Sequence, residues 1–279
     1  MPPATRRRRF LGTVGQHAVL IAFGCIFLFP FIFVIFTALM TKFQAVTPHF
    51  WPQPFQWSNF GDVFKRIPFL RYTWNTVQIA VFSTVGILVS CIPVAYALAR
   101  MRWRGRQIAF VLVLATLMLP FQVTIIPLYV IWVRVHQIGH MTPLILPSFL
   151  GDAFSIFLLR QFFLTIPEEL SDAARVDGAS EWQIMTRVIV PLAKPAIAAV
   201  ALFSFLYNWN DLFAPLLFLG NNQKLWTLTL ALSEFQSRHG VEWNLTMAAA
   251  ALFMLPVIVL FFLAQRVFVE GVTLTGVKG

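Results

Sequence analysis

The sequence predicts an all-α membrane protein with about six transmembrane helices and one charged helical loop. Of its 279 residues, 58% are hydrophobic and only 11% are charged, whereas a soluble domain carries roughly 25% charged residues. The apolar residues come in long runs, and the 30 Phe and nine Trp suit lipid-facing and interfacial positions. A globular protein this poor in charge would lack a solvating surface, so a soluble domain is excluded.

Six apolar runs are candidate membrane spans, because each is near or above the roughly 20 residues that a helix needs to cross the hydrocarbon. The runs are Val19–Met40, Trp74–Ala99, Gln107–Val133, Thr142–Leu164, Ala196–Leu219 and Thr246–Phe268. Turn-forming and charged residues interrupt the fourth run: Pro143, Pro147, Gly151 and Asp152. Pro120 and Pro127 lie inside the third run, where proline can kink a helix.

The distribution of basic residues predicts how these spans are oriented. If the N-terminus lies inside, 14 of the 21 Lys and Arg residues fall on the cytoplasmic side, in agreement with the positive-inside rule. The net charge of +10 is therefore explained by the basic residues that orient the spans in the membrane. We expect no nucleic-acid binding. This divides the chain into a cytoplasmic basic N-terminus (1–16), a transmembrane domain (17–269) and a cytoplasmic C-terminal tail (270–279).

Two loops stand out within the predicted transmembrane domain. The external loop 41–73 is rich in aromatic residues and turns, and it either receives a soluble partner or forms an interfacial aromatic belt. The cytoplasmic loop 165–195 is charged and has the pattern of two short helices. Thr165 with Glu168, and Ser180 with Gln183, have the spacing of capping boxes that start these helices.

The two predicted helices of the loop meet at a glycine. Gly178 follows Asp177 and suits the residue after a helix C-cap, where a positive φ costs glycine little. Pro191 is expected to end the second helix. The side chains of Ala173 and Ala174 are short, so a partner can approach the backbone closely at this point. The loop is thus predicted to be a helical elbow that transmits motion from outside the membrane bundle.

This elbow resembles the EAA loop of importer permeases of the ATP-binding-cassette class. The resemblance rests on Asp172-Ala173-Ala174, Asp177-Gly178-Ala179 and Ile189-Val190-Pro191-Leu192. Asp172 stands where the family carries Glu, so the carboxylate is one methylene shorter. The similarity extends from about Asn59 to the end of the chain and is to the carbohydrate-uptake branch, the maltose-type permeases.

The resemblance implies a coupling helix at about Leu170–Asp177, which would lie in a groove of an ATPase subunit. The implied contact residues are Leu170, Asp172, Ala173, Ala174, Asp177, Gly178 and Ala179. The C-terminal tail would be a second contact, through Gly276, Lys278 and Gly279. The implied partners are a second homologous permease, an ATPase dimer, an extracytoplasmic solute-binding protein and membrane lipid. The implied location is the inner membrane of a bacterium or archaeon, and the implied cargo is a sugar-like solute, from oligosaccharides to glycerol phosphate.

No catalytic or cofactor site is expected on this chain. The histidines are scattered, and His136 and His140, four residues apart, have no third metal ligand nearby. Gly271–Lys278 departs from a phosphate-binding loop, because the lysine comes one residue late and no Ser or Thr follows it. ATP and magnesium are therefore expected on the partner ATPase, and this chain is expected to be a transport subunit rather than an enzyme.

A solute path needs polar groups, which are costly inside a membrane. The strongest cluster lies in the outer half of the fifth run: Asn208, Trp209, Asn210 and Asp211. Its amides and carboxylate suit hydroxyl groups, and its indole suits a sugar ring, although one helix face cannot present all four. Asp152 and Gln122 are further candidates. The alternative is that these residues hold helices together or belong to an aromatic belt.

Two other functions remain as alternatives at this stage. An ion-coupled secondary transporter would use Asp211 or Asp152 as its ion site, but such carriers often show two related halves and do not need a docking elbow. A membrane scaffold or assembly factor would leave the polar cluster of the fifth run without a role.

Overall fold

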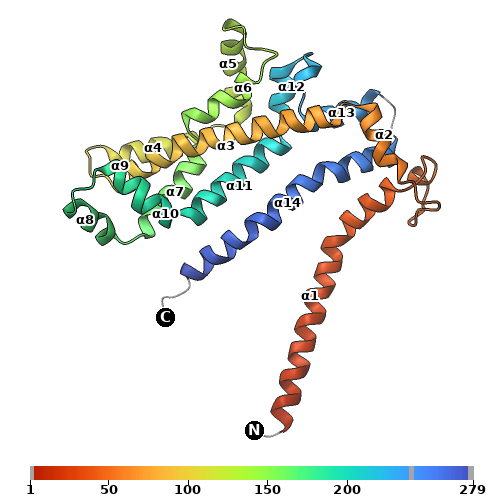
Figure 1. Ribbon diagram of the computed structural model, residues 1–279, viewed down its shortest axis with the longest axis horizontal. Coiled ribbons are helices and arrows are strands. Elements are labelled where there is room, and N and C mark those ends of the chain that lie inside the picture. Colours follow the sequence, from red (N-terminus) through yellow and green to blue (C-terminus); the bar gives the residue numbers. More distant parts are fainter. Residues whose placement is uncertain (1–2, 239–241, 276–279) are drawn as a thin grey trace. The chain divides into compact units, whose positions relative to one another are not determined.

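The computed structural model describes the backbone of residues 3–238 and 242–275, and all elements in these ranges are helical (Figure 1). Side chains are described for residues 15–233 and 242–265. The chain divides into two compact units. The first comprises Met1–Pro68 and Leu232–Leu255, and the second comprises Phe69–Ala231 and Pro256–Gly279.

The all-α membrane class predicted from the sequence is confirmed. Four described helical segments are long and apolar enough to span a membrane: Gly15–Ala38, Phe69–Ala99, Thr142–Thr165 and Trp243–Gln265. Two bent pairs of helices raise the number to as many as six. Because of these bends, the observed helices are not continuous over the apolar runs from which the spans were predicted.

In the first unit, Asn59 ties the segment after the first helix together. Helix α1 (Pro3–Ala38) is followed by η1 (Gln44–Val46) and α2 (Ser58–Arg66). Asn59 Nδ2 donates to the carbonyls of Ala38 and Met40, each at 2.8 Å. Its Oδ1 accepts from Asn244 Nδ2 at 3.3 Å, in helix α14 (Trp243–Thr275). The amide thus satisfies carbonyls that α1 leaves open at its end and joins them to a segment 185 residues away.

Ion pairs and edge-on ring contacts complete the same unit. Glu242 bonds to Lys42 at 2.8 Å and to Arg66 at 3.2 Å. The ring of Phe36 meets Trp51 edge-on at 5.0 Å between centroids, and Trp51 meets Phe55 at 5.9 Å. The aromatic segment predicted as an external loop therefore packs against the end of α1.

Helix α3 (Phe69–Ala99) is the axis of the second unit. It packs along α11 (Lys194–Asn210) and α7 (Ala153–Thr165), and these helices lie side by side in Figure 1. Small buried residues let the backbones approach closely, as membrane helices require: Ala95, Ala99, Ala193 and Ala196. At Gly86 a Cβ atom would come within 2.7 Å of the Phe149 ring, so a larger residue there would require this ring of η2 (Leu146–Leu150), or the helix itself, to shift.

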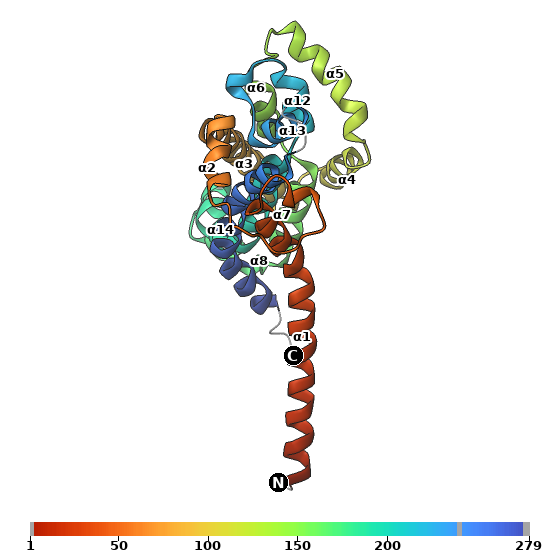
Figure 2. The same cartoon turned by 90° about the vertical axis from the view of Figure 1, so that its right-hand side faces the viewer.

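The third predicted span is broken. Helices α4 (Arg106–Thr116) and α5 (Phe121–Arg134) meet at a bend of 92°, which Figure 2 shows from the side. Pro120 is the N-cap of α5 and Pro127 lies within α5. The fourth run divides as its interruptions suggest, into α6 (Thr142–Ile145), η2 and α7, with Asp152 accepting from Ser155 N at 2.7 Å as the N-cap of α7.

The fifth predicted span, Ala196–Leu219, is wrong as a single helix. Helix α11 ends at Asn210, and a separate helix, α12 (Phe213–Leu219), follows. Asp211 adopts an extended conformation, and its Oδ1 accepts from the backbone N–H groups of Phe213 and Ala214 at 3.0 and 3.3 Å. Local capping by the aspartate therefore outweighs the continuous hydrophobicity. Helices η4 (Gln223–Leu225) and α13 (Leu228–Arg238) come next.

The prediction that Pro191 ends its helix is also wrong. Helix α9 (Glu181–Ile184) continues through a π-helical turn, Met185–Ile189, into α10 (Val190–Leu192). The π turn widens the backbone just before Pro191, where the ring would otherwise strike the preceding turn. The break comes at Ala193 instead, with a bend of 80° between Glu181–Leu192 and Lys194–Asn210.

Two buried arginines join α3 and α7 where both helices end. Arg160 Nε, on α7, donates to the Leu98 carbonyl near the end of α3 at 3.1 Å, and Arg100 Nη2, just after α3, donates to the Ile166 carbonyl that caps α7. Each cation thus meets the open carbonyls and negative dipole of the other helix's C-terminus. Arg160 also lies 3.8 Å over the Phe110 ring of α4. Burial lowers the pKa of the Arg100 guanidinium.

We expect Arg160→Met to lower the free energy of unfolding by about 2–4 kcal/mol, because it removes a charged hydrogen bond and a cation–π contact from a buried position. Thermal unfolding of the purified chain in detergent measures this. Arg102→Met is the matched control: its ion pair with Glu168 is exposed and contributes less than about 1 kcal/mol. Equal effects of the two substitutions would contradict the assigned role of Arg160.

Candidate functional site

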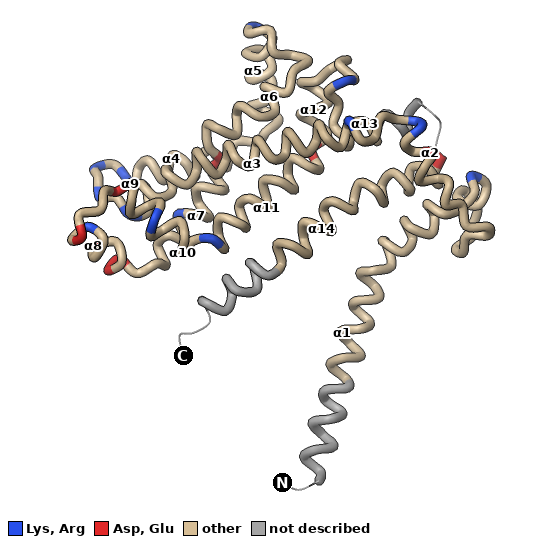
Figure 3. The backbone as a smooth tube through the Cα atoms, viewed as in Figure 1, with Lys and Arg blue, Asp and Glu red and all other residues tan. Residues whose placement is uncertain are grey.

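The charged loop forms the predicted elbow from α8 (Glu168–Val176) and α9. Figure 3 shows charged residues gathered around α8, α9 and α10, in contrast to the central parts of α3 and α11. The capping box of Ser180 and Gln183 is confirmed. The one at Thr165 is wrong: Pro167 is the N-cap of α8, and Thr165 Oγ1 donates to the Phe162 carbonyl at the end of α7. The proline delays the helix start by two residues.

The predicted glycine turn between the two helices is confirmed. Gly178 has φ +80°, its N–H donates to Arg175 O at 3.0 Å, and the N–H of Ala179 donates to Ala174 O at 2.9 Å. These two bonds are those of a Schellman motif. A residue with a Cβ would be strained in this conformation, so the turn holds α8 and α9 at a fixed angle.

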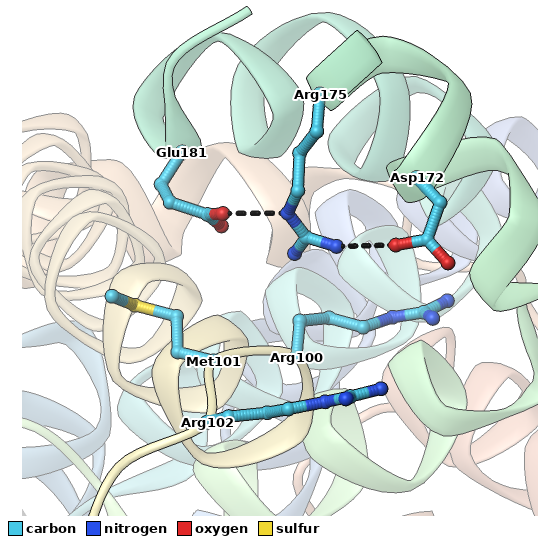
Figure 4. Close-up of a pocket in the computed structure, with 6 residues that line it drawn as sticks. All are labelled: Arg100, Met101, Arg102, Asp172, Arg175 and Glu181. Atoms are coloured by element: carbon cyan, nitrogen blue, oxygen red, sulfur yellow. Dashed lines mark hydrogen bonds and ion pairs between the residues drawn. The ribbon is translucent and has the colours of Figure 1, made fainter.

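Ion pairs reinforce the turn. Arg175 Nη1 donates to Asp172 Oδ1 at 2.7 Å within α8, and Arg175 Nε donates to Glu181 Oε1 at 2.9 Å in α9 (Figure 4). The hydrogen bond to Glu181 raises the pKa of the Arg175 guanidinium. The other oxygen of Glu181 accepts from the Tyr96 hydroxyl on α3 at 2.6 Å. Asp172, Arg175 and Glu181 line a cavity of about 430 Å³ together with Arg100, Met101 and Arg102.

Three large apolar side chains of the elbow are exposed. Val176 is 88% exposed, Trp182 is 65% exposed and Leu170 is 43% exposed. Of the residues expected to contact an ATPase, Asp172, Ala173, Asp177 and Gly178 are exposed as well. Ala174 and Ala179 instead pack against the core of the second unit. The elbow therefore packs against the second unit through Ala174 and Ala179 and leaves large apolar side chains exposed on its surface.

The polar cluster of the fifth span lies at the break between α11 and α12. Asn208 and Asp211 line a cleft of about 160 Å³, together with Tyr207 and Ser148. The remaining lining residues are apolar and come from α3, α5, α6, η2 and α12: Ile79, Ile87, Phe121, Leu128, Pro143, Leu144, Pro147, Ala214, Pro215 and Phe218. The cleft thus offers hydroxyl, amide and carboxylate groups on an otherwise apolar surface.

The other predicted path residues lie apart from this cleft. Trp209 is fully buried, its ring stacks on Phe205, and its carbonyl accepts from Thr229 Oγ1. Asn210 is exposed and donates to the Leu206 carbonyl. Gln122 is exposed, and its neighbour Phe121 lines the cleft in its place. The helix separates the four consecutive residues onto different faces.

Sequence reasoning missed Tyr207 and Ser148. Tyr207 is four residues before Asp211, and in the continuous helix expected from the sequence this spacing would have marked Tyr207 as a candidate on the same face. The Asp172–Arg175 pair has a similar local spacing, i to i+3. No local pattern connects Tyr96 to Glu181, because 85 residues separate them.

Two predicted sites need separate mention. Gly276, Lys278 and Gly279 lie outside the described residues. In the described ranges, no group of three His, Cys, Asp or Glu side chains is arranged to hold a metal ion.

Comparison with known proteins bears on this arrangement. Residues 91–274 match the family model described as "Binding-protein-dependent transport system inner membrane component". The chain is 34% identical over 238 residues to the arabinooligosaccharides transport system permease protein AraQ of Halalkalibacterium halodurans, covering 85% of this chain and 84% of that one. It is 33% identical over 270 residues to the sn-glycerol-3-phosphate transport system permease protein UgpE of Brucella abortus, covering 93% and 95%.

A solved structure has the same fold. It is a bacterial ABC transporter involved in the import of the acidic polysaccharide alginate, with a TM-score of 0.80 at 25% identity, covering 95% of this chain and 99% of that one. The family match covers the elbow, the arginines that join α3 to α7 and the part of the cleft that lies after residue 91. The chain therefore belongs to the family of inner-membrane components of binding-protein-dependent transport systems, the permeases that its elbow resembles.

Proposed function

We propose that this chain is a permease subunit of an ATP-driven importer that carries a sugar or sugar-like solute across the inner membrane of a bacterium or archaeon. The proposal rests on the elbow, in which the ion pairs of Arg175 hold α8 and α9 together. Leu170, Val176 and Trp182 are exposed on this elbow, in a chain that belongs to the permease family. The solutes named for its relatives support the sugar-like class.

The exposed face of the elbow is the docking surface for an ATPase subunit. The groove of the ATPase receives α8, with Leu170, Asp172, Ala173, Asp177 and Gly178 at the contact and Ala174 and Ala179 supporting them from behind. ATP and magnesium are bound by that partner, and this chain holds no cofactor. ATP shifts the transporter between inward-facing and outward-facing states because it binds the two states differently.

The remaining partners follow from the same assembly. A second homologous permease pairs with this chain, and an extracytoplasmic binding protein delivers the solute on the opposite side from the elbow. The elbow and both termini are cytoplasmic, as the distribution of Lys and Arg indicates. The tail residues Gly276, Lys278 and Gly279 make a second contact with the ATPase pair.

The cleft beside α11 lies on the solute path and favours an uncharged solute. Its polar groups are Ser148, Tyr207, Asn208 and Asp211, and its lining contains no Lys, Arg or His. A carboxylate without a cation beside it repels anions, while hydroxyl and amide groups suit the hydroxyls of a neutral sugar. The ion-coupled alternative is less favoured, because Asp211 already caps α12 through two backbone N–H groups.

Affinity purification of this chain from native membranes in mild detergent tests the assembly. We expect a homologous permease, an ATPase with a Walker motif and a solute-binding protein to co-purify. Recovery of this chain alone, still able to transport a solute after reconstitution, would contradict the proposal.

We expect Val176→Asp to reduce the amount of ATPase that co-purifies by about tenfold or more, because it buries a charge in an apolar contact. The membrane-embedded fold is unaffected, since Val176 is 88% exposed. Val46→Asp, at a position 60% exposed in η1, is the matched control and retains the ATPase. If the Val176→Asp variant still co-purified with the full amount of ATPase, Val176 would not be part of the docking surface.

We expect Asp211→Asn to raise the ratio of glycerol 3-phosphate uptake to neutral oligosaccharide uptake by about tenfold, because it removes a negative charge from the cleft. Asparagine preserves the helix cap. Asp62→Asn, at an exposed carboxylate of α2 that pairs with Lys65, is the control and leaves the ratio unchanged. Radiolabelled uptake into proteoliposomes measures both solutes, and an equal fall in both would place Asp211 off the path.

A further inference from the structure

Glu181 connects two helices that approach it from different parts of the chain. As the first residue of α9, it uses one carboxylate oxygen to accept from Arg175 Nε at 2.9 Å and the other to accept from the Tyr96 hydroxyl at 2.6 Å. Tyr96 is only 3% exposed and lies in the last turns of α3. The carboxylate therefore bridges the elbow and a membrane span.

Arg175 extends this bridge into the coupling helix. Its planar guanidinium bonds to Glu181 on one side and to Asp172 on the other (Figure 4), and such fixed forks restrict orientation more than a single bond does. Tyr96, Glu181, Arg175 and Asp172 thus form one continuous polar chain from α3 to α8, which we call the elbow bridge.

A second contact ties the other end of α8 to the same region of the chain. Arg102, just beyond α3, bonds to Glu168 at the start of α8 at 2.8 Å. Between these attachments, α8 is connected covalently only through the short segments at Ile166–Pro167 and Asp177–Ser180. The Arg102 pair is exposed and contributes little. The ion pairs of the elbow bridge are exposed too, but this bridge alone continues to a buried group, the Tyr96 hydroxyl on α3.

We propose that Tyr96 and Glu181 are positioning residues for transport: they fix the docking face of α8 relative to α3, so that displacement of α8 moves the span. This inference rests on the proposed role of the elbow. Without the bridge, α8 would be held to α3 only by apolar packing at Ala174, by the exposed Arg102 pair and by its covalent connections, and it would absorb part of the displacement. The hydroxyl of Tyr96 is the group on which the link to the membrane span depends.

Tyr96→Phe in the reconstituted transporter tests the inference, because it removes one hydroxyl and keeps the ring. We expect the number of ATP molecules hydrolysed per solute transported to rise about fivefold, with the ATPase still bound. Glu181→Gln, which loses the charge that pairs with Arg175, has the same direction of effect. Tyr129→Phe in α5, whose ring stacks on Phe218, is the matched control and leaves the ratio unchanged. An unchanged ratio in Tyr96→Phe would overturn the inference.

A distance measurement on the full chain, made without transport, separates this inference from the proposed function. Spin labels at Val176→Cys on α8 and Arg104→Cys after α3, with the exposed Cys25 replaced by Ser, report the orientation of α8 by pulsed electron resonance. We expect a single narrow distance distribution that broadens in Tyr96→Phe and stays narrow in Tyr129→Phe. An equally narrow distribution in Tyr96→Phe would show that the bridge does not position α8, whatever the chain transports.

Discussion

The second unit depends on two hydrogen bonds by which Arg160 and Arg100 connect the C-terminal ends of α3 and α7. Helix ends leave carbonyls without partners, and apolar surroundings offer no water to satisfy them. Here each helix supplies the cation for the other: Arg160 reaches Leu98 O, and Arg100 reaches Ile166 O. The contact of Arg160 with Phe110 brings α4 into the same junction. The elbow begins directly after this junction, so its position follows from that of the two spans.

Helix α3 also connects the two candidate sites. Ile79 and Ile87 line the cleft, and Tyr96 bonds to the elbow. Ile79 and Tyr96 are 17 positions apart in the printed sequence, which is roughly 25 Å along an α-helix. A single continuous helix therefore touches both the cleft and the elbow bridge. Coupling between such sites needs an element with two arrangements that both sites bias, and α3 is placed to be that element.

The sequence predicted the elements well where the signal is local. Long apolar runs identified the spans, the Ser180–Gln183 spacing identified a helix start, and Gly178 identified the turn. The failures have a common physical cause. Hydropathy measures how apolar a segment is, but a helix breaks where backbone groups find better partners, as at Asp211, or where a proline shifts the boundary, as at Pro167. The π turn before Pro191 depends on tertiary packing and has no simple sequence signature. For the candidate sites, the elbow residues could be named in advance, whereas the Tyr96–Glu181 contact depends on folding that brings distant segments together.

Asn59 has a consequence for how the protein is made. Its partners Ala38 and Met40 leave the ribosome shortly before it, but Asn244 follows 185 residues later. The Glu242 ion pairs with Lys42 and Arg66 have the same long delay. During synthesis, the segment after α1 must therefore wait with unsatisfied polar groups until the last span has been translated. This unit can therefore reach its final form only after the start of α14 has been translated.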